Sequence, residues 1–349
     1  MIPLLTAPAL RKCSGIWMNK IKEALQMKKL DALQTAALLK EKDQILILCH
    51  RRPDGDTLGA GFGLLRALRD LGKQVRIECA DEFPSRFQFL WEGLDMDNQP
   101  QFEPDFVVAV DVASTGLLGA GVEEKWKDKV DLSIDHHGSN SGFAKAIFLD
   151  PEAAAACQIM HKVIAGLVPL TRQIALCLYT GLATDTGCFR YSNTTADTLY
   201  TAAELVKTGI NSAGVNKKLF ETKSKGRILL EQRALSHLEY GFDGRMAMVT
   251  IFKKDLEAAA VTEMETEGLS EMVRQIEGVE ISLLIREQDP EEYRVSVRTG
   301  NMADASQICA RFGGGGHARA AGCTLCQPLD QAKAALKSAC GAALENREE

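Results

Sequence analysis

The sequence contains no apolar run close to the roughly 20 residues that a membrane-spanning helix needs, so we expect no transmembrane segment and no membrane partner. It also shows no cleavable secretion signal. The ten cysteines are scattered through apolar stretches instead of forming a compact disulfide framework. Together these absences predict a protein of the reducing cytoplasm.

Aromatic residues make up only 6% of the chain, and the net charge is -6. We therefore expect no broad basic surface for binding duplex DNA. A processive exonuclease would carry a basic track interleaved with aromatic side chains, which this composition does not favour. A short nucleotide or oligonucleotide held at a local basic pocket remains compatible with the charge.

The 349 residues are enough for two domains, and 46% hydrophobic with 25% charged side chains is typical of a globular protein. Short apolar segments alternate with amphipathic ones, beginning with an expected helix over residues 21–40. This alternation predicts an α/β fold, with a doubly wound, mainly parallel sheet in residues 18–210. A helical connection over 211–240 leads to a smaller C-terminal α/β domain over 241–345. Residues 1–17 form an extension that we expect to lack order and to which we assign no function.

Polar side chains end three of the predicted buried strands. His50 follows "QILILC", Asp111 ends "VVAVD", and Asp135, His136 and His137 end "LSIDHH". Because the carboxyl ends of parallel strands meet at one edge of a sheet, we expect these side chains to converge there.

Three further aspartates belong to the same pattern: Asp54 and Asp56 in "PDGD", and Asp185 in "TDTG". Each motif alone has a simple structural explanation, as a turn, a helix cap or a helix end. Gathered with the strand-end residues, however, the carboxylates would raise one another's pKa and destabilise the fold unless divalent cations neutralised them. Carboxylate oxygens with a few imidazoles favour Mn²⁺ or Mg²⁺. The "CTLC" pair, Cys323 and Cys326, has no partner pair at zinc spacing, so we expect two small buried residues on a strand.

The series "HRRPDGD", "VVAVDVA", "IDHH" and "TDTG" resembles the four motifs of the DHH phosphoesterase family. The later "FGGGGHARAAGC" resembles the family's DHH-associated C-terminal domain. The motifs keep their order and together span residues from about 18 to about 340. The sequence is most similar to the nano-RNase/pAp-phosphatase group of this family.

The resemblance implies two Mn²⁺ ions, with Mg²⁺ as the alternative. It implies that the first ion is bound by His50, Asp54 and Asp111. It implies that the second is bound by Asp56, Asp111, His136 and Asp185. Asp111 would bridge the pair, Asp135 would orient His136, and His137 would face the substrate phosphate as a hydrogen-bond donor or as the acid for the leaving oxygen.

The resemblance also implies that substrate binds in a cleft between the domains. The loop with Gly314, Gly315, Gly316 and His317 offers backbone amides to a phosphate. By itself such a loop is more often a flexible lead into a strand. Candidates for gripping the remote phosphate or base are Arg298 and His317, with Arg190 as a third.

The leading hypothesis is a Mn²⁺-dependent phosphoesterase that degrades short oligoribonucleotides to nucleoside monophosphates and also dephosphorylates 3'-phosphoadenosine-5'-phosphate (pAp). One alternative is a cyclic-dinucleotide phosphodiesterase, and a pyrophosphatase is less favoured because of the glycine loop. Another alternative is a catalytically silent nucleotide-binding module on the same fold. The sequence leaves cleavage polarity, preferred substrate length and a homodimer open.

Overall fold

The structure is a computed structural model that describes residues 27–266 and 268–345, except for the side chains of Met264 and His317. The predicted extension over residues 1–17 lies outside the described residues. The chain divides between Thr222 and Lys223 into two compact units.

The first unit is built on a six-stranded sheet in which every pair of neighbouring strands is parallel. The strand order is β1-β6-β5-β4-β2-β3. The strands are β1 (Lys28–Lys29), β2 (Ile45–Leu48), β3 (Val75–Glu78), β4 (Phe106–Val110), β5 (Leu132–Asp135) and β6 (Ala146–Leu149). Both faces of β2 and β4 are buried, as expected of a parallel sheet covered on both sides.

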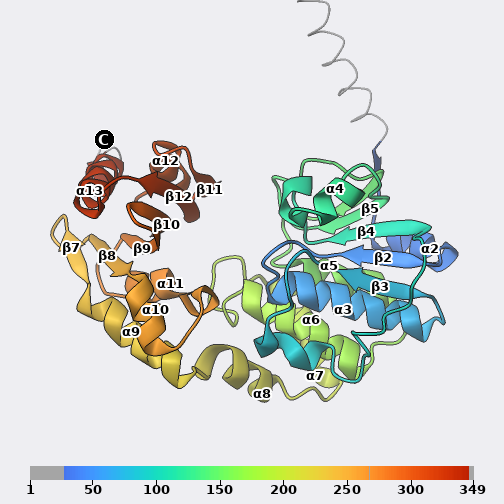
Figure 1. Cartoon of the computed structure of the whole chain (residues 1–349). Helices are drawn as coiled ribbons and strands as arrows, with labels where there is room; N and C mark the ends of the chain where they lie inside the picture. The colour runs from blue at the N-terminus through green and yellow to red at the C-terminus, as the bar shows by residue number, and fades with distance from the viewer. Residues whose placement is uncertain (1–26, 267, 346–349) are drawn as a thin grey trace, which may run out of the picture. The chain divides into compact units, whose positions relative to one another are not determined.

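Helices cover both faces of this sheet, which confirms the doubly wound prediction (Figure 1). One face packs against α2 (Ala32–Glu41), α3 (Gly55–Asp70), α5 (Ala156–Ala165), α6 (Arg172–Asp185) and α7 (Ala196–Lys207). The other face is covered by η2 (Thr115–Leu118) and α4 (Val122–Trp126). Alternation along β2 serves both layers, because Ile45 and Ile47 join the first core and Leu46 and Leu48 join the second. The unit also contains η1 (Ser85–Leu90), α8 (Ser212–Asn216) and one π-helical turn, η3 (Lys217–Glu221).

The helix predicted over residues 21–40 is wrong at its start. Residues 21–26 lie outside the described part of the chain, and Lys28–Lys29 form β1 on the edge of β6. The helix α2 begins only after Asp31, whose side chain and that of Gln34 form a reciprocal capping box. This cap fixes the helix start more strongly than the apolar spacing upstream of it.

The second unit contains a mixed sheet in the order β11-β12-β10-β9-β8-β7, in which only β8 and β9 pair in parallel within the described residues. Its strands are β7 (Glu239–Gly241), β8 (Met246–Ile251), β9 (Ile281–Asp289), β10 (Glu292–Thr299), β11 (Gly315–His317) and β12 (Ala320–Cys326). One face packs against α12 (Ala305–Ala310) and α13 (Leu329–Glu345). The other packs against α9 (Lys225–Ser236), α10 (Lys253–Ala259) and α11 (Leu269–Arg274), with η4 (Glu263–Thr266) between α10 and α11.

Two expectations for this unit need correction. The glycine-rich segment is a short strand, because β11 pairs with β12, and a Cβ at Gly316 would lie 2.5 Å from the Ala320 carbonyl oxygen. In "CTLC", Cys323 is buried but Cys326 is exposed. Residues three apart on a strand face opposite sides of the sheet, and along β12 only the face that carries Cys323 is buried.

Within the described ranges, no helix combines the length and the apolar character needed to cross a bilayer.

Candidate metal centre at the edge of the first sheet

The polar cluster lies where the order of the parallel strands reverses. From β2 the chain first adds β3 on one side and then β4 on the other. The carboxyl ends of β2 and β4 therefore flank the switch point, which is where open α/β sheets bind their ligands. His50 follows β2 and Asp111 follows β4. The sheet topology thus brings together residues 61 positions apart in the sequence.

His50 presents its Nε2 atom to two carboxylates. This nitrogen lies 3.5 Å from Asp54 Oδ1 and 3.5 Å from Asp111 Oδ2. The other ring nitrogen, Nδ1, donates to the Arg51 carbonyl oxygen at 2.8 Å. Such a bond fixes the tautomer in which Nε2 carries the lone pair available to a metal. Asp54 is also the N-cap of α3, since its Oδ1 accepts the amides of Asp56 and Thr57.

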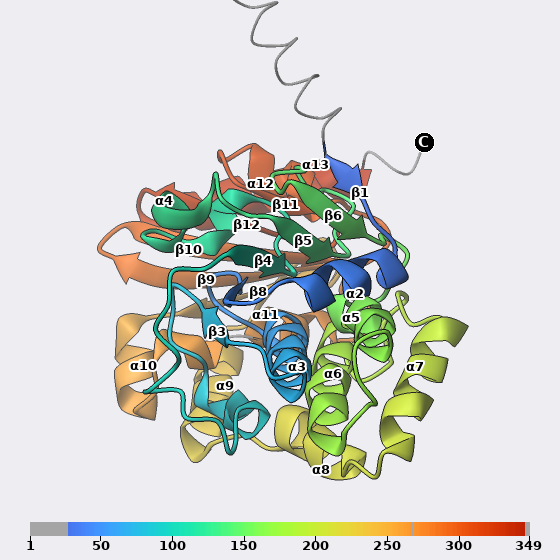
Figure 2. The same cartoon turned by 90° about the vertical axis from the view of Figure 1, so that its right-hand side faces the viewer.

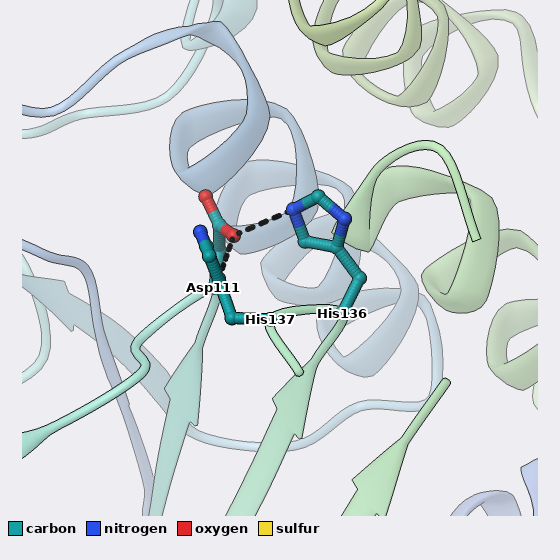
Figure 3. Close-up of side chains that lie close together, drawn as sticks. All are labelled: Asp111, His136 and His137. Atoms are coloured by element: carbon teal, nitrogen blue, oxygen red, sulfur yellow. Dashed lines mark ion pairs between the residues drawn. The ribbon is translucent and has the colours of Figure 1, made fainter. Parts of the chain in front are cut away.

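Asp111 is the centre of the cluster. Its Oδ1 lies 3.5 Å from His136 Nε2 and 3.5 Å from His137 Nδ1, so that the carboxylate sits between the two imidazoles (Figure 3). This oxygen is buried, yet it accepts no hydrogen bond from any described residue. Asp111 also has a left-handed backbone with φ of 58°, a conformation that is uncommon for non-glycine residues. A strained, buried and unsatisfied carboxylate is costly unless a ligand compensates it.

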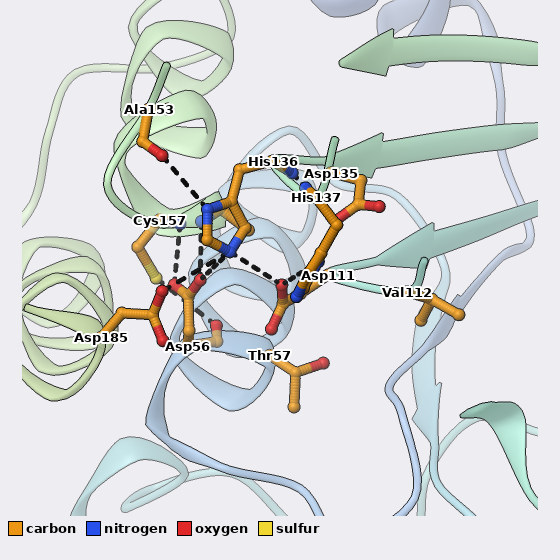
Figure 4. Close-up of polar contacts among 12 residues, drawn as sticks. Asp56, Thr57, Asp111, Val112, Asp135, His136, His137, Ala153, Cys157 and Asp185 are labelled. Carbon is orange, nitrogen blue, oxygen red and sulfur yellow. Dashed lines mark hydrogen bonds and ion pairs between the residues drawn. The ribbon is translucent and has the colours of Figure 1, made fainter. Parts of the chain in front are cut away.

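Asp56 and Asp185 lie at the same ring nitrogen of His136 as Asp111 does (Figure 4). His136 Nε2 lies 3.8 Å from Asp56 Oδ2 and 3.5 Å from Asp185 Oδ2. The close packing of α3 on α6 sets this geometry, because a Cβ at Gly181 would lie 2.7 Å from Asp56 Oδ1. Asp56 is fixed further by α5, whose Ala156 amide donates to Oδ2 at 2.6 Å.

The donor set fits divalent cations. Three groups of side chains each place one ligand atom within 4.8 Å of the others. They are His50 with Asp54 and Asp111, Asp56 with His136 and Asp185, and Asp111 with His136 and His137. Carboxylate oxygens and imidazole nitrogens are the ligands expected for Mn²⁺ or Mg²⁺, and the unsatisfied Asp111 oxygen is shared between groups.

Asp135 acts on His137, which differs from the expectation that it orients the His136 ring. Asp135 Oδ1 accepts from His137 Nδ1 at 2.8 Å and from the His136 amide at 2.8 Å. The His136 ring is held instead by the Ala153 carbonyl oxygen, 3.1 Å from Nδ1. Asn140 donates to Asp135 Oδ2. The two adjacent imidazoles thus have different partners, Ala153 for His136 and Asp135 for His137.

Burial and mutual repulsion raise the pKa of the carboxylates that lack a strong donor. Burial raises the pKa of Asp111 to about 7, and the Asp56 charge acts in the same direction. The pKa of Asp185 is raised well above its usual range by burial and by the Asp56 and Asp111 charges. By contrast, burial of Asp54 is outweighed by the neighbouring His50, which lowers the Asp54 pKa.

The imidazoles respond in the opposite way. Burial lowers the pKa of His50, but the Asp111 and Asp54 carboxylates outweigh burial and raise it to about 11. The hydrogen bond to Asp135 raises the pKa of His137 to about 9. In the metal-free protein His50 and His137 therefore stay protonated at neutral pH and partly neutralise the carboxylates.

These shifts predict how pH affects the metal-free protein. His50 and His137 have folded-state pKa values above the unfolded value of about 6.5, so the stability that they contribute is fully present below that pH. This stability is lost as pH rises through the pKa of His137, about 9, and then through that of His50, about 11. With excess chelator, the melting temperature should therefore fall as pH is raised from 6.5 to 9. Scanning calorimetry checks this. With saturating Mn²⁺ the fall should be smaller, because deprotonated ligands bind metal more tightly; an equal fall would contradict the assignment.

The predicted substrate residues do not all join this cluster. Arg190 follows α6 in the first unit, and its Nε donates to the Gly187 carbonyl oxygen at 2.6 Å. Arg298 lies on β10 of the second unit, where its Nε is 2.6 Å from Glu271 Oε1. The Gly314 amide donates to the Cys309 carbonyl oxygen and is not available to a phosphate. Gly315 and Gly316 belong to β11, as does the His317 backbone, whereas the His317 side chain is outside the described part of the structure.

Sequence reasoning missed the residues that support the cluster. Thr57 donates to the Val110 carbonyl oxygen at 3.0 Å and so ties α3 to the end of β4. Cys157 donates its amide to Asp56 Oδ1 at 2.9 Å. Asn140 and Ala153 hold Asp135 and His136, as described above. Of these, only Asn140 had a local signal, since it follows the histidine pair by three residues.

Comparison with known proteins gives two family matches. Residues 44–182 match the DHH family N-terminal domain, and residues 246–344 match the DHHA1 domain. A bifunctional oligoribonuclease and PAP phosphatase NrnA from Thermus thermophilus is 35% identical over 80% of this chain and 84% of its own length. The protein of that name from Bacillus subtilis is 26% identical over 81% of this chain and 90% of its own.

Two further relatives are more distant. A cyclic-di-AMP phosphodiesterase GdpP from Geobacillus thermodenitrificans is 25% identical over 80% of this chain, but the match covers only 44% of that protein. The crystal structure of an exopolyphosphatase-related protein from Bacteroides fragilis shares the fold, with a TM-score of 0.81 and 22% identity over 91% of this chain and 98% of that one. Both domains occur in order, and one relative is 35% identical along most of both chains, so the chain belongs to the DHH family of metal-dependent phosphoesterases.

Proposed function

We propose that the chain is a Mn²⁺-dependent phosphoesterase that hydrolyses short oligoribonucleotides, such as pApA, to nucleoside monophosphates. The observation that carries the proposal is the buried Asp111 carboxylate, shared between two groups of metal-type ligands at the switch point of the sheet. The names of the Thermus and Bacillus relatives support the substrate class and extend it to removal of the 3'-phosphate of pAp.

One ion would be held by His50, Asp54 and Asp111, and the other by Asp56, Asp111, His136 and Asp185. When bound, two divalent cations acidify a shared water and neutralise charge on the phosphoryl oxygens. Mn²⁺ is proposed over Mg²⁺ because Mg²⁺ is a hard cation that takes oxygen ligands, and this set includes two imidazole nitrogens.

The chain's own residues would orient the substrate and move protons. Asp135 accepts a hydrogen bond from Nδ1 of His137, so Nε2 is the ring nitrogen that would act on the substrate. His137 then serves as a donor to the phosphate or as the acid for the leaving oxygen. Asp135 is a positioning residue, held in turn by Asn140.

The second unit would bind the remote end of the substrate through β11, His317 and Arg298, and Arg190 is a further candidate from the first unit. Binding in a cleft between the units stays a prediction, as do the cytoplasmic location, the domain limits and a homodimer.

Arg298 gives a direct test of this role. Glu271 fixes its guanidinium and is itself held by the Ser270 hydroxyl at 2.9 Å. Arg298→Met should raise KM for pApA about 10- to 100-fold while kcat changes much less, because a charge-assisted contact to a non-reacting phosphate is lost. Steady-state kinetics checks this, with Arg294→Met on the same strand as the control. A fall in kcat with unchanged KM would oppose a remote binding role.

A cyclic-dinucleotide phosphodiesterase is the second candidate, favoured by the similarity to the GdpP protein. Initial rates with Mn²⁺ on pApA, pAp, cyclic di-AMP and pyrophosphate separate the candidates. Preference for pApA and pAp supports the proposal, and preference for cyclic di-AMP supports the alternative. Tight nucleotide binding with no turnover of any of the four would identify a silent module.

A further inference from the structure

The first unit contains a second candidate ligand site, remote from the metal centre. A cavity of about 640 Å³ lies among α3, η1, the first turns of α6 and the segment around α8. Arg172, on its wall, begins α6, and Asp185 ends the same helix. Thirteen residues of helix at 1.5 Å each separate the two by roughly 20 Å. No metal-centre residue lines the cavity.

Positive side chains dominate the cavity wall. Arg66, Arg172 and Lys218 line it, and Glu92 is the one acidic lining residue. Within the described ranges, none of the three cations forms an ion pair with a carboxylate. In a chain of net charge -6, three such cations around one cavity favour an anionic ligand.

The guanidinium of Arg66 is partly unsatisfied. Its Nη2 donates to the carbonyl oxygens of Leu90 and Glu92, both at 2.9 Å, which fixes the group in place. Its Nε is buried and has no hydrogen-bond partner among the described residues. The fixed guanidinium therefore contributes its positive charge to the wall of the cavity, which Arg66 lines.

The rest of the lining is apolar. Phe89, Leu176, Ile210 and Val215 contribute hydrocarbon surface, and Lys218 Nζ lies 4.7 Å from the centre of the Phe89 ring. The volume falls in the range of small-molecule sites, about 300–1,000 Å³. An inorganic anion would leave most of this space and surface unused. The lining therefore suits a ligand with a phosphate group and an apolar or aromatic body.

The cavity also touches the last elements of the first unit. Val215 belongs to α8, which packs against α6 (Figure 2), and Lys218 belongs to the π-helical turn η3. π-helical turns are rare and are often found at functional sites. The chain leaves this turn at Glu221 and enters the second unit at Lys223. A ligand in the cavity would thus contact the segment that leads from one unit to the other.

We propose that this cavity binds a nucleoside monophosphate, with the phosphate among Arg66, Arg172 and Lys218 and the base against Phe89 and Leu176. The choice of ligand rests on the proposed function, since nucleoside monophosphates are the products of that reaction. The site would let accumulated product act on the segment that joins the units, away from the metal centre.

Equilibrium dialysis of labelled AMP against the Mn²⁺-loaded full chain tests the proposal. The variant is Arg172→Glu with Lys218→Glu; both side chains are exposed, so it should fold. The control is Lys40→Glu with Lys127→Glu, two exposed lysines outside the cavity with the same change in charge.

We expect the wild type and the control to bind AMP at the metal centre and at a second site. The cavity variant should bind AMP at the second site at least about tenfold more weakly, through loss of two charge-assisted contacts. It should hydrolyse pApA at the wild-type rate.

Amide exchange over residues 211–221 gives an independent readout. AMP should slow exchange there in the wild type and not in the cavity variant. Unchanged AMP binding and exchange in the cavity variant would overturn the site. Inorganic phosphate or adenosine binding there as tightly as AMP would overturn the assigned ligand class. The cavity site and the proposed function can also fail separately. If the cavity variant lost AMP binding but the wild-type chain hydrolysed none of the tested substrates, the cavity site would stand and the proposed function would be refuted.

Discussion

Replacing Asp111 by asparagine is expected to lower kcat/KM for Mn²⁺-supported hydrolysis of pApA by roughly 10³-fold or more, or about 4 kcal/mol of transition-state stabilisation. The carboxylate lies within 3.5 Å of nitrogens from His50, His136 and His137, so its charge serves both groups of ligands. Asparagine keeps the shape of the side chain and adopts the left-handed backbone at φ 58° more readily than alanine does. Steady-state kinetics with Mn²⁺ checks the result.

The control for this substitution is Asp128→Asn, which removes the same charge from an exposed position in the same unit. It should leave kcat/KM within about twofold, because exposed charges far from a site are screened by salt. The melting temperature of the chelated Asp111→Asn protein should stay close to that of the wild type, because asparagine removes the repulsion from Asp56 but also weakens the pairing with His50. Substantial Mn²⁺-dependent turnover by Asp111→Asn would show that the carboxylate is not shared between metals.

Asp56→Asn should affect both activity and stability. Both carboxylate oxygens of Asp56 accept backbone amides at the start of α5, from Ala156 at 2.6 Å and from Cys157 at 2.9 Å. Asparagine would turn one of these acceptors into a donor that faces an amide, at a fully buried position. We expect a loss of about 2–3 kcal/mol, which corresponds to a melting temperature lower by roughly 5–10 °C. Activity should fall to a similar extent as in Asp111→Asn.

Asp54→Asn is the matched comparison, because it lies in the same motif and is also a proposed ligand. Asp54 caps α3 through Oδ1, and asparagine is an equally good N-cap. Its activity should fall while its melting temperature stays within about 2 °C of the wild type. All melts are run with chelator, so that loss of bound metal does not contribute. Equal melting temperatures for Asp56→Asn and Asp54→Asn would contradict the stabilising role assigned to the hydrogen bonds between Asp56 and the start of α5.

The sequence predicted the positions of the cluster well because strand ends are a local feature. "LILC" and "VVAV" are apolar over four residues and are followed directly by His50 and Asp111, and the mainly apolar "LSI" is followed by Asp135. Parallel sheets bring such ends together whatever the exact strand order. The ligand candidates could therefore be proposed without knowing that β4 pairs with β2 on the side opposite β3.

The supporting contacts could not be predicted in this way, because they depend on distances between distant segments. Nothing local to Asp135 indicates whether it faces the ring of His136 or that of His137. That choice depends on Ala153, 17 residues downstream, whose carbonyl oxygen accepts a hydrogen bond from Nδ1 of His136. The capping of α5 by Asp56 joins residues about 100 apart and requires the close packing of α3 on α6 at Gly181.

The second unit shows a different limit. A run of four glycines is typical of a loop, and intrinsic propensity argues against a strand. Pairing with β12 outweighs that propensity, since Gly315 and Gly316 pair with Gly322 and Ala321. Tertiary pairing of this kind is not visible in a window of a few residues.

The most direct test of the account is an anomalous diffraction map from crystals grown with saturating Mn²⁺. We predict two peaks per chain at the switch point, both within bonding distance of Asp111, with His50 on one and His136 on the other. A single peak that does not contact Asp111, or no peak among these side chains, would contradict the assignment of the cluster as a two-metal centre.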